Sequence, residues 1–152
     1  MTETAGCLTC SARWDRRGNN VGGVLPCLKM QLRDVPEYGF LSSNDPPSGE
    51  IYVKGNSVFK GYYKDQEMTS KVVDKEGWLR TGDIAIYYPN GSLKIIDRVK
   101  ELAKLQSGTF IAPQKLENLY INAPLINQIL VDVNSLSGFL VAIVSCVEEK
   151  LI

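Results

Sequence analysis

The stretch EGWLRTGDIAIYYPNGSLKIIDRVK, residues 76–100, contains two turn signals and predicts a β-hairpin. Asn-Gly at positions 90 and 91 lies between two apolar runs, which is the strongest short-range signal for a hairpin. It predicts antiparallel strands at about 83–88 and 92–97. The other signal, Thr-Gly-Asp at 81–83, predicts a tight turn that fixes an aspartate at a sharp bend. An acid, an arginine and a lysine follow at the far end of the hairpin.

The residues before this hairpin also predict antiparallel β-structure. Apolar and polar residues alternate in LKMQLRDV, residues 28–35, as is typical of a half-buried strand. GEIYVKG, residues 49–55, predicts a second strand that pairs with the first across the turn-rich connector SSNDPPSG. A short helix is expected at 66–74. Residues 1–23 are polar and punctuated by glycines, so we expect them to form a loop.

The pattern changes after the hairpin. Pro113 predicts a helix start, because its missing N–H does no harm in the first turn. Asn122-Ala-Pro predicts the end of that helix. Strands are expected at about 126–133 and 138–147. The predicted fold class is therefore α+β, with a β-rich first part that meets an α+β second part near residues 98–101.

The composition excludes several classes of function. The 152 residues include 17 Lys+Arg and 17 Asp+Glu, so net charge gives no reason to expect nucleic acid as a partner. The chain has no histidine, which excludes Ser-His-Asp and Cys-His catalysis. The longest apolar run, FLVAIV at 139–144, is too short to cross a bilayer, so no transmembrane segment is expected.

Four stretches carry a family resemblance: MTETAGC at the start of the chain, VGGVLPCLKMQLRDV, GEIYVKGNSVFKGYYKD, and EGWLRTGDIAIYYPNGSLKIIDRVKELAKLQSGTFIAPQKLEN. Thr-Gly-Asp alone is a weak motif. Its spacing to PNGSLKIIDR, followed by two lysines and IAPQKLEN, is specific. Together these stretches resemble the adenylate-forming acyl-CoA synthetase superfamily, and most closely the long-chain fatty acid–CoA ligases.

This resemblance implies a domain organisation. Residues 1–98 resemble the C-terminal, β-rich part of the large AMP-binding domain, 99–108 the hinge and linker, and 109–152 the first half of the small α+β C-terminal domain. The family's Ser/Thr/Gly-rich phosphate loop and its C-terminal catalytic lysine have no counterpart in the 152 residues. We therefore expect the chain to be an internal fragment of such a ligase, inactive by itself.

The resemblance implies that Asp83 and Arg98 bind nucleotide. One ionised carboxylate can accept hydrogen bonds from both hydroxyls of a ribose, and such charge-assisted bonds are strong. A guanidinium stays charged and offers a planar fork of donors to ribose or phosphate oxygens. The residues alone leave alternatives open: Asp83 as a helix or turn cap, and Arg98 as the partner of Asp97 in a surface ion pair.

The resemblance also implies roles for four further residues. Lys100 falls on the domain hinge, and Lys104 on a catalytic lysine that serves the thioester step in some relatives. Thr2 matches a phosphate-binding residue and Glu3 a ligand of Mg²⁺, for which a hydroxyl and a hard carboxylate oxygen are suitable groups. A solvated charged surface is the alternative for the lysines.

The implied reaction is the activation of a fatty acid by ATP to acyl-AMP, followed by transfer to CoA. ATP, Mg²⁺, CoA and a fatty acid are therefore the expected cofactors and partners of the complete enzyme. Its expected location is the cytoplasm, or the endoplasmic reticulum membrane through regions outside this chain, with peripheral membrane association. The alternatives are a non-catalytic nucleotide-binding remnant and a fragment of another adenylate-forming ligase.

Overall fold

The computed structural model describes residues 1–16, 18–105, 108, 110–133 and 139–147. The chain divides into two compact units, Met1–Val99 and Lys100–Ile152. Strands predominate in both units, and every strand pair is antiparallel. The expected α+β class is confirmed. Neither α-helix among the described residues has the length and apolar character needed to cross a bilayer.

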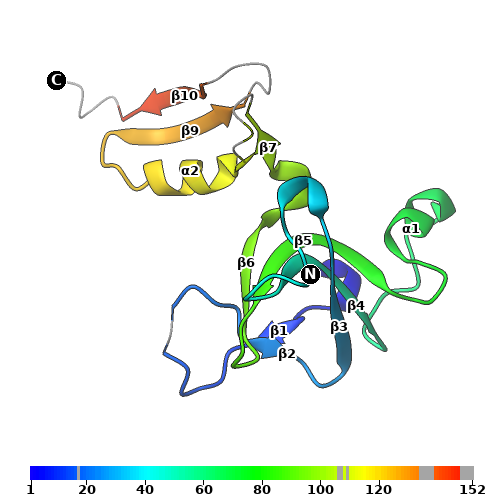
Figure 1. Ribbon diagram of the computed structural model, residues 1–152. Helices are drawn as coiled ribbons and strands as arrows, with labels where there is room; N and C mark the ends of the chain where they lie inside the picture. The colour runs from blue at the N-terminus through cyan, green and yellow to red at the C-terminus, as the bar shows by residue number, and fades with distance from the viewer. Residues whose placement is uncertain (17, 106–107, 109, 134–138, 148–152) are drawn as a thin grey trace. The chain divides into compact units, whose positions relative to one another are not determined.

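A four-stranded antiparallel sheet, in the order β3-β4-β5-β6, forms the centre of the first unit (Figure 1). Both pairings expected from the sequence, between the two early strands and within the hairpin, are confirmed. β4 is an inner strand and is buried along most of its length. The four strands are β3 (Leu28–Arg33), β4 (Ser48–Gly55), β5 (Leu79–Tyr87) and β6 (Leu93–Arg98).

Short elements surround this sheet. The expected helix after β4 is confirmed as α1 (Gln66–Val72), and the Asp65 carboxylate caps it by accepting from the Met68 N–H. The expectation of a loop over residues 1–23 is wrong in part, because short elements form there. Pairing with residues beyond Gly22 stabilises one of them, which no local pattern could indicate. These elements are η1 (Thr2–Thr4), β1 (Thr9–Cys10) and β2 (Gly23–Val24), with η2 (Pro36–Tyr38) later in the chain.

The hydrophobic core of the first unit lies on this sheet. Ile51 and Val53 alternate along β4 and meet Leu79, Ala85 and Leu93 from the two following strands. Leu79 and Ala85 are fully buried. Each Å² of apolar surface removed from water stabilises the fold by about 25 cal/mol. This buried cluster is therefore the main stabilising feature of the unit.

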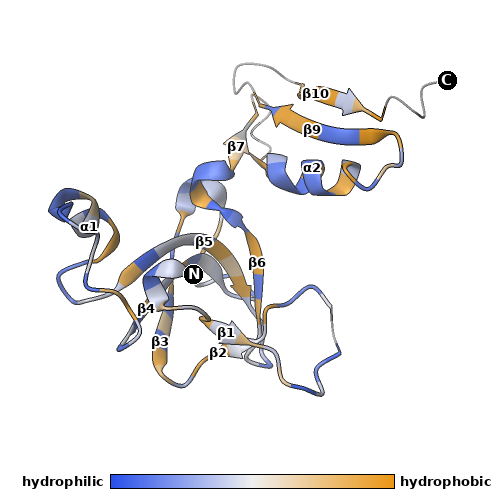
Figure 2. Cartoon of the chain, turned by 180° about the vertical axis from the view of Figure 1, so that it is seen from behind, coloured by the Kyte–Doolittle hydropathy of each residue, from blue (hydrophilic) through white to orange (hydrophobic). Residues whose placement is uncertain are grey.

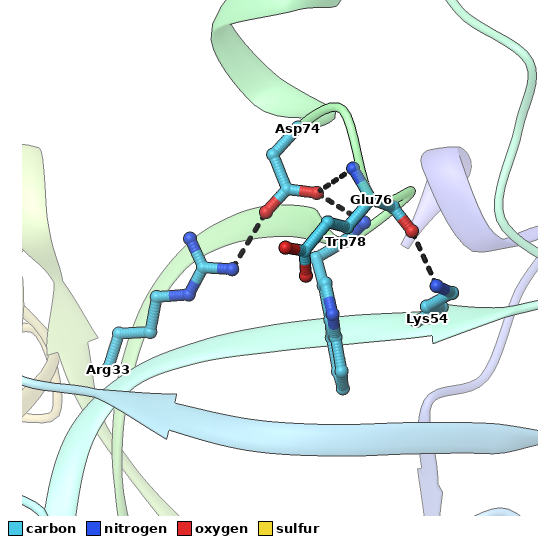
Figure 3. Close-up of polar contacts among 5 residues, drawn as sticks. All are labelled: Arg33, Lys54, Asp74, Glu76 and Trp78. Atoms are coloured by element: carbon cyan, nitrogen blue, oxygen red, sulfur yellow. Dashed lines mark hydrogen bonds and ion pairs between the residues drawn. The ribbon is translucent and has the colours of Figure 1, made fainter.

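An aspartate organises the connection between α1 and β5 (Figure 3). Asp74 Oδ1 accepts from the backbone N–H groups of Glu76, at 3.0 Å, and Trp78, at 2.9 Å. Its Oδ2 accepts from Arg33 Nη2 on β3 at 2.7 Å, while Lys54 on β4 donates to the carbonyl oxygen of Glu76. These contacts tie the connection to two neighbouring strands and fix the residue at which β5 begins.

In its described residues, the second unit contains short strands and one α-helix. The expected helix is confirmed as α2 (Pro113–Tyr120). The two expected strands are confirmed as β9 (Ile126–Asp132) and β10 (Val141–Cys146), which pair with each other, although residue 138 of the second prediction lies outside the described residues. The Glu117 carboxylate of α2 accepts from the Val131 N–H of β9 at 2.7 Å. β10 is rich in hydrophobic residues (Figure 2), yet all of them are exposed. The remaining elements are η3 (Val99–Glu101), β7 (Ala103–Lys104) and β8 (Phe110–Ile111).

Candidate functional site

Asp83 and Arg98 occupy directly paired positions on β5 and β6. Arg98 Nε donates to Asp83 Oδ1 at 3.2 Å, and the two side chains form an ion pair. The side chain of Asp83 is 23% exposed and that of Arg98 is 64% exposed. The sequence offered Asp97 as an ion-pair partner of Arg98, but the partner in the structure is Asp83. Asp97 is buried instead, and its Oδ1 accepts from the Arg98 backbone N–H at 2.7 Å.

The Thr-Gly-Asp motif forms a bulge inside β5, so the prediction of a tight turn before the strand is wrong. Across the β4–β5 ladder, Tyr52 pairs with Arg80 and Glu50 pairs with Ile84, which leaves three residues of β5 opposite Ile51 alone. The motif's Gly82 has φ +78°, a conformation that glycine adopts without strain. Bulges of this kind re-aim side chains beside functional sites.

Hydrogen bonds of Thr81 hold the bulge. Its hydroxyl donates to the carbonyl oxygen of Ile51 at 3.0 Å and accepts from the Asp83 N–H at 3.1 Å. One side chain therefore fixes both the opposing strand and the backbone of the aspartate. Thr81 was not among the predicted site residues, because its long-range partner could not be inferred from the motif.

The surroundings of Asp83 are largely apolar. It lines a cavity of about 110 Å³ with residues such as Val24, Met30 and Leu93. Burial raises the pKa of the Asp83 carboxyl above its usual value, the Arg98 guanidinium partly offsets this, and the negative charge of Glu50 adds to the rise. The carboxyl is thus a partly desolvated acceptor beside a solvent-exposed cation.

Thr2 and Glu3 lie elsewhere in the first unit. The Glu3 carbonyl accepts from the Phe59 N–H at 2.8 Å, and its Oε1 accepts from the Tyr62 hydroxyl at 3.1 Å. Thr2 is exposed. In the part of the chain that the structure describes, no hydrogen bond or ion pair links either residue to Asp83.

The two predicted lysines lie at the start of the second unit. Lys100 is exposed in η3, at the first residue beyond Met1–Val99. Lys104 lies in β7, and its side chain is outside what the structure describes.

The hydrogen-bonding groups of Asp83 and Arg98 fit a sugar diol. A carboxylate can accept two hydroxyls, and the exposed guanidinium keeps further N–H groups for ligand oxygens. The fit to a metal is narrower. Glu3 offers one carboxylate, and no cluster of three His, Cys, Asp or Glu residues suited to a metal ion occurs among the described residues. Mg²⁺ commonly takes one or two carboxylates and completes its shell with phosphates and water, so Glu3 is compatible with that arrangement.

These observations agree with comparisons to known proteins. Residues 1–63 match the family described as AMP-binding enzyme. The match lies in the first unit, and the chain as a whole is similar to curated long-chain acyl-CoA synthetases.

Its curated relatives are long-chain acyl-CoA synthetases. The chain is 44% identical to long chain acyl-CoA synthetase 7, peroxisomal, of Arabidopsis thaliana, over 99% of this chain and 22% of that protein. It is 46% identical to long-chain-fatty-acid–CoA ligase 1 of Homo sapiens, over 93% of this chain and 20% of that protein. The chain thus spans about a fifth of the length of the relatives it matches.

Solved structures of adenylation domains are also similar. The A domain of carboxylic acid reductase from Segniliparus rugosus, in complex with AMP and a co-purified carboxylic acid, has a TM-score of 0.78 and 38% identity over 84% of this chain and 21% of that one. The corresponding domain from Mycobacterium chelonae has a TM-score of 0.76 and 41% identity, over 81% of this chain and 19% of that one.

Proposed function

We propose that this chain contributes a ribose-binding site and a domain hinge to an ATP-dependent long-chain fatty acid–CoA ligase. In such a reaction the fatty acid carboxylate attacks the α-phosphate of ATP, forming acyl-AMP and releasing pyrophosphate. The thiolate of CoA then displaces AMP and forms the thioester. The observation that carries the proposal is the pairing of Asp83 with Arg98 on adjacent strands.

Asp83 accepts hydrogen bonds from the two ribose hydroxyls. Its carboxylate lines a mostly apolar cavity, where a charge-assisted hydrogen bond is stronger than in water. Arg98 keeps that carboxylate ionised and donates its remaining N–H groups to ribose or phosphate oxygens. Both tasks require the two side chains to face one another. The 3.2 Å contact between Arg98 Nε and Asp83 Oδ1 meets this requirement.

The remaining assignments follow the family resemblance. Thr2 binds phosphate and Glu3 contributes a ligand to Mg²⁺, whose charge supports phosphoryl chemistry when it is bound. Lys100 is the hinge residue, in keeping with its exposure at the boundary between the two units. Lys104 serves the thioester step. Residues 1–98 form part of the large domain, 99–108 the hinge and linker, and 109–152 part of the small domain.

Two other functions share the same ribose site. The similarity to carboxylic acid reductase adenylation domains supports another adenylate-forming enzyme that acts on a carboxylic acid. The second alternative is a remnant that binds nucleotide but does not catalyse a reaction. The 44% to 46% identity to long-chain ligases, over nearly the whole chain, favours the CoA ligase.

The cellular location is proposed as the cytoplasm, or the endoplasmic reticulum membrane by peripheral association of the complete enzyme. One relative is named peroxisomal. Fluorescent tagging of the native protein, with markers for these three compartments, distinguishes them.

A chimera tests the proposed function. Residues 1–152 replace the aligned segment of the human long-chain ligase, which is 46% identical, and palmitate-dependent ATP–pyrophosphate exchange and acyl-CoA formation are measured. We expect activity from the chimera, and a sharp rise in the Michaelis constant for ATP in its D83A variant. An exchange-active chimera whose Michaelis constant for ATP is unchanged by D83A contradicts the ribose role. A folded chimera that makes acyl-AMP but no acyl-CoA contradicts the ligase assignment.

A further inference from the structure

A second ion pair spans the bulge that presents Asp83. Arg80 Nε lies 2.6 Å from Glu50 Oε1, and the Glu50 side chain is only 5% exposed. Arg80 immediately precedes the bulge, and Glu50 pairs with Ile84, which immediately follows Asp83. The side-chain contact therefore joins the two sides of the three-residue bulge.

We propose that Glu50 and Arg80 form a positioning pair that holds the bulge, aims Asp83 at Arg98 and balances the charge beside it. The proposal rests on the ribose role proposed for Asp83. Neither Glu50 nor Arg80 was among the site residues predicted from the sequence.

The Glu50–Arg80 contact stabilises the bulge by joining β4 to β5 beside it. Thr81 ties the bulge to β4 through the carbonyl oxygen of Ile51, at 3.0 Å, but that bond acts at the centre of the bulge. The Glu50–Arg80 contact closes the bulge from outside, so the backbone of β5 cannot extend and rotate Asp83 away. Glu50 is the buried partner of this pair, and removing Arg80 would leave its charge without compensation, which is costly.

Charge provides a second link between the pair and Asp83. The charged groups that act on Asp83 are Arg98 on β6 and Glu50 on β4, and Glu50 in turn pairs with Arg80 on β5. Asp97, which precedes Arg98 on β6, is buried. Glu37 adds a more distant negative charge that acts on Arg80. Glu50 raises the pKa of Asp83. Its carboxylate is paired with Arg80, and by the proposal this pairing limits the effect. Without Arg80, the negative charge of Glu50 would act on Asp83 without that compensation.

The test is a carboxyl ¹³C NMR titration of Asp83 in the 152-residue chain, with AMP titrations at each pH. R80Q is expected to move the Asp83 midpoint to higher pH and to weaken AMP binding about tenfold at mildly acidic pH, as the loss of one charge-assisted hydrogen bond does. E50Q is expected to move the midpoint the other way. K71Q, which removes an equal charge from the exposed Lys71–Glu67 pair on α1, is the matched control and leaves the midpoint unchanged.

Further variants keep the test decisive. R80K retains the charge and is expected to restore the midpoint. If R80Q does not fold, E50Q/R80Q removes both charges, and its midpoint is expected below that of the wild type. Unchanged midpoints in folded E50Q and R80Q, or equal shifts in K71Q, overturn the proposal. Opposite shifts in E50Q and R80Q without any AMP binding by the wild type support the action of the pair on Asp83 and overturn the nucleotide role.

Discussion

Arg98 Nε and Asp83 Oδ1 lie 3.2 Å apart on directly paired positions of β5 and β6. The two residues are separated by 15 positions in the sequence, and the hairpin between them brings them together. Because the carboxylate is mostly buried and the guanidinium mostly exposed, ligand oxygens and hydroxyls can reach the pair from the side of Arg98. This relationship underlies the predictions about Asp83.

D83N is expected to be at least as stable as the wild type at pH 7. Burial raises the folded-state pKa of Asp83, so ionisation costs the folded state stability. This cost is absent below the unfolded pKa and grows as the pH rises through the folded pKa. Urea unfolding at pH 4 and pH 7 measures it, with D132N, at an exposed position on β9, as the control. Marked destabilisation of D83N at pH 7 would show that the bond to Arg98 outweighs burial.

D74N is expected to lower the urea midpoint at pH 7, because it weakens the acceptor for Arg33 and for two backbone N–H groups. The hydrogen bond from Arg33 lowers the pKa of Asp74 below its unfolded value near 3.8. Its contribution is therefore present above that value and lost as the pH falls through the folded pKa. E76Q is the matched control, since Glu76 takes part through backbone atoms (Figure 3). A difference between D74N and wild type that persists undiminished in acid contradicts this account.

L79A is expected to destabilise the first unit by about 2–5 kcal/mol, the usual range for truncating a fully buried leucine. Leu79 is 0% exposed and packs against Ile51 and Val53. L119A, at a position 66% exposed on α2, should change stability by less than about 0.5 kcal/mol. Chemical denaturation followed by circular dichroism compares them. Equal effects of the two substitutions would refute the placement of the core.

The isolated chain is expected to show no ATP–pyrophosphate exchange with palmitate. Its 152 residues contain no Ser/Thr/Gly-rich phosphate loop, and groups that stabilise transition-state charge contribute orders of magnitude to rate. A radiometric exchange assay with the full-length human relative as positive control measures this. Exchange above background would show that such a loop is dispensable.

The sequence predicted the elements with strong local signals. Asn90-Gly91 indicated the hairpin, and Pro113 the start of α2, because turn and helix-start preferences act over a few residues. The bulge at Thr81–Asp83 was predicted as a tight turn, since a glycine with positive φ serves both structures and the pairing with β4 decides between them. β5 consequently begins at Leu79, earlier than predicted.

Site residues that belong to a sequence motif could be predicted. Site residues that are brought together only by strand pairing could not. Asp83 and Arg98 could be named from the motif, although their contact depends on strand register. Glu50 and Arg80 lie 30 positions apart, and no local pattern indicates that they meet. A carboxylate in a predicted strand is normally expected to face solvent. Glu50 is buried instead, because β4 is an inner strand of the sheet.

The most direct test of the central claim compares AMP with 2′,3′-dideoxy-AMP in NMR titrations of the wild-type chain and D83A. The account predicts that the wild type binds AMP at least about tenfold more tightly than the analogue without the diol, since two charge-assisted hydrogen bonds are lost. It predicts that D83A binds both ligands equally weakly. Equal binding of the two ligands by the wild type, or the same preference for AMP in D83A, would contradict the claim that Asp83 holds the ribose.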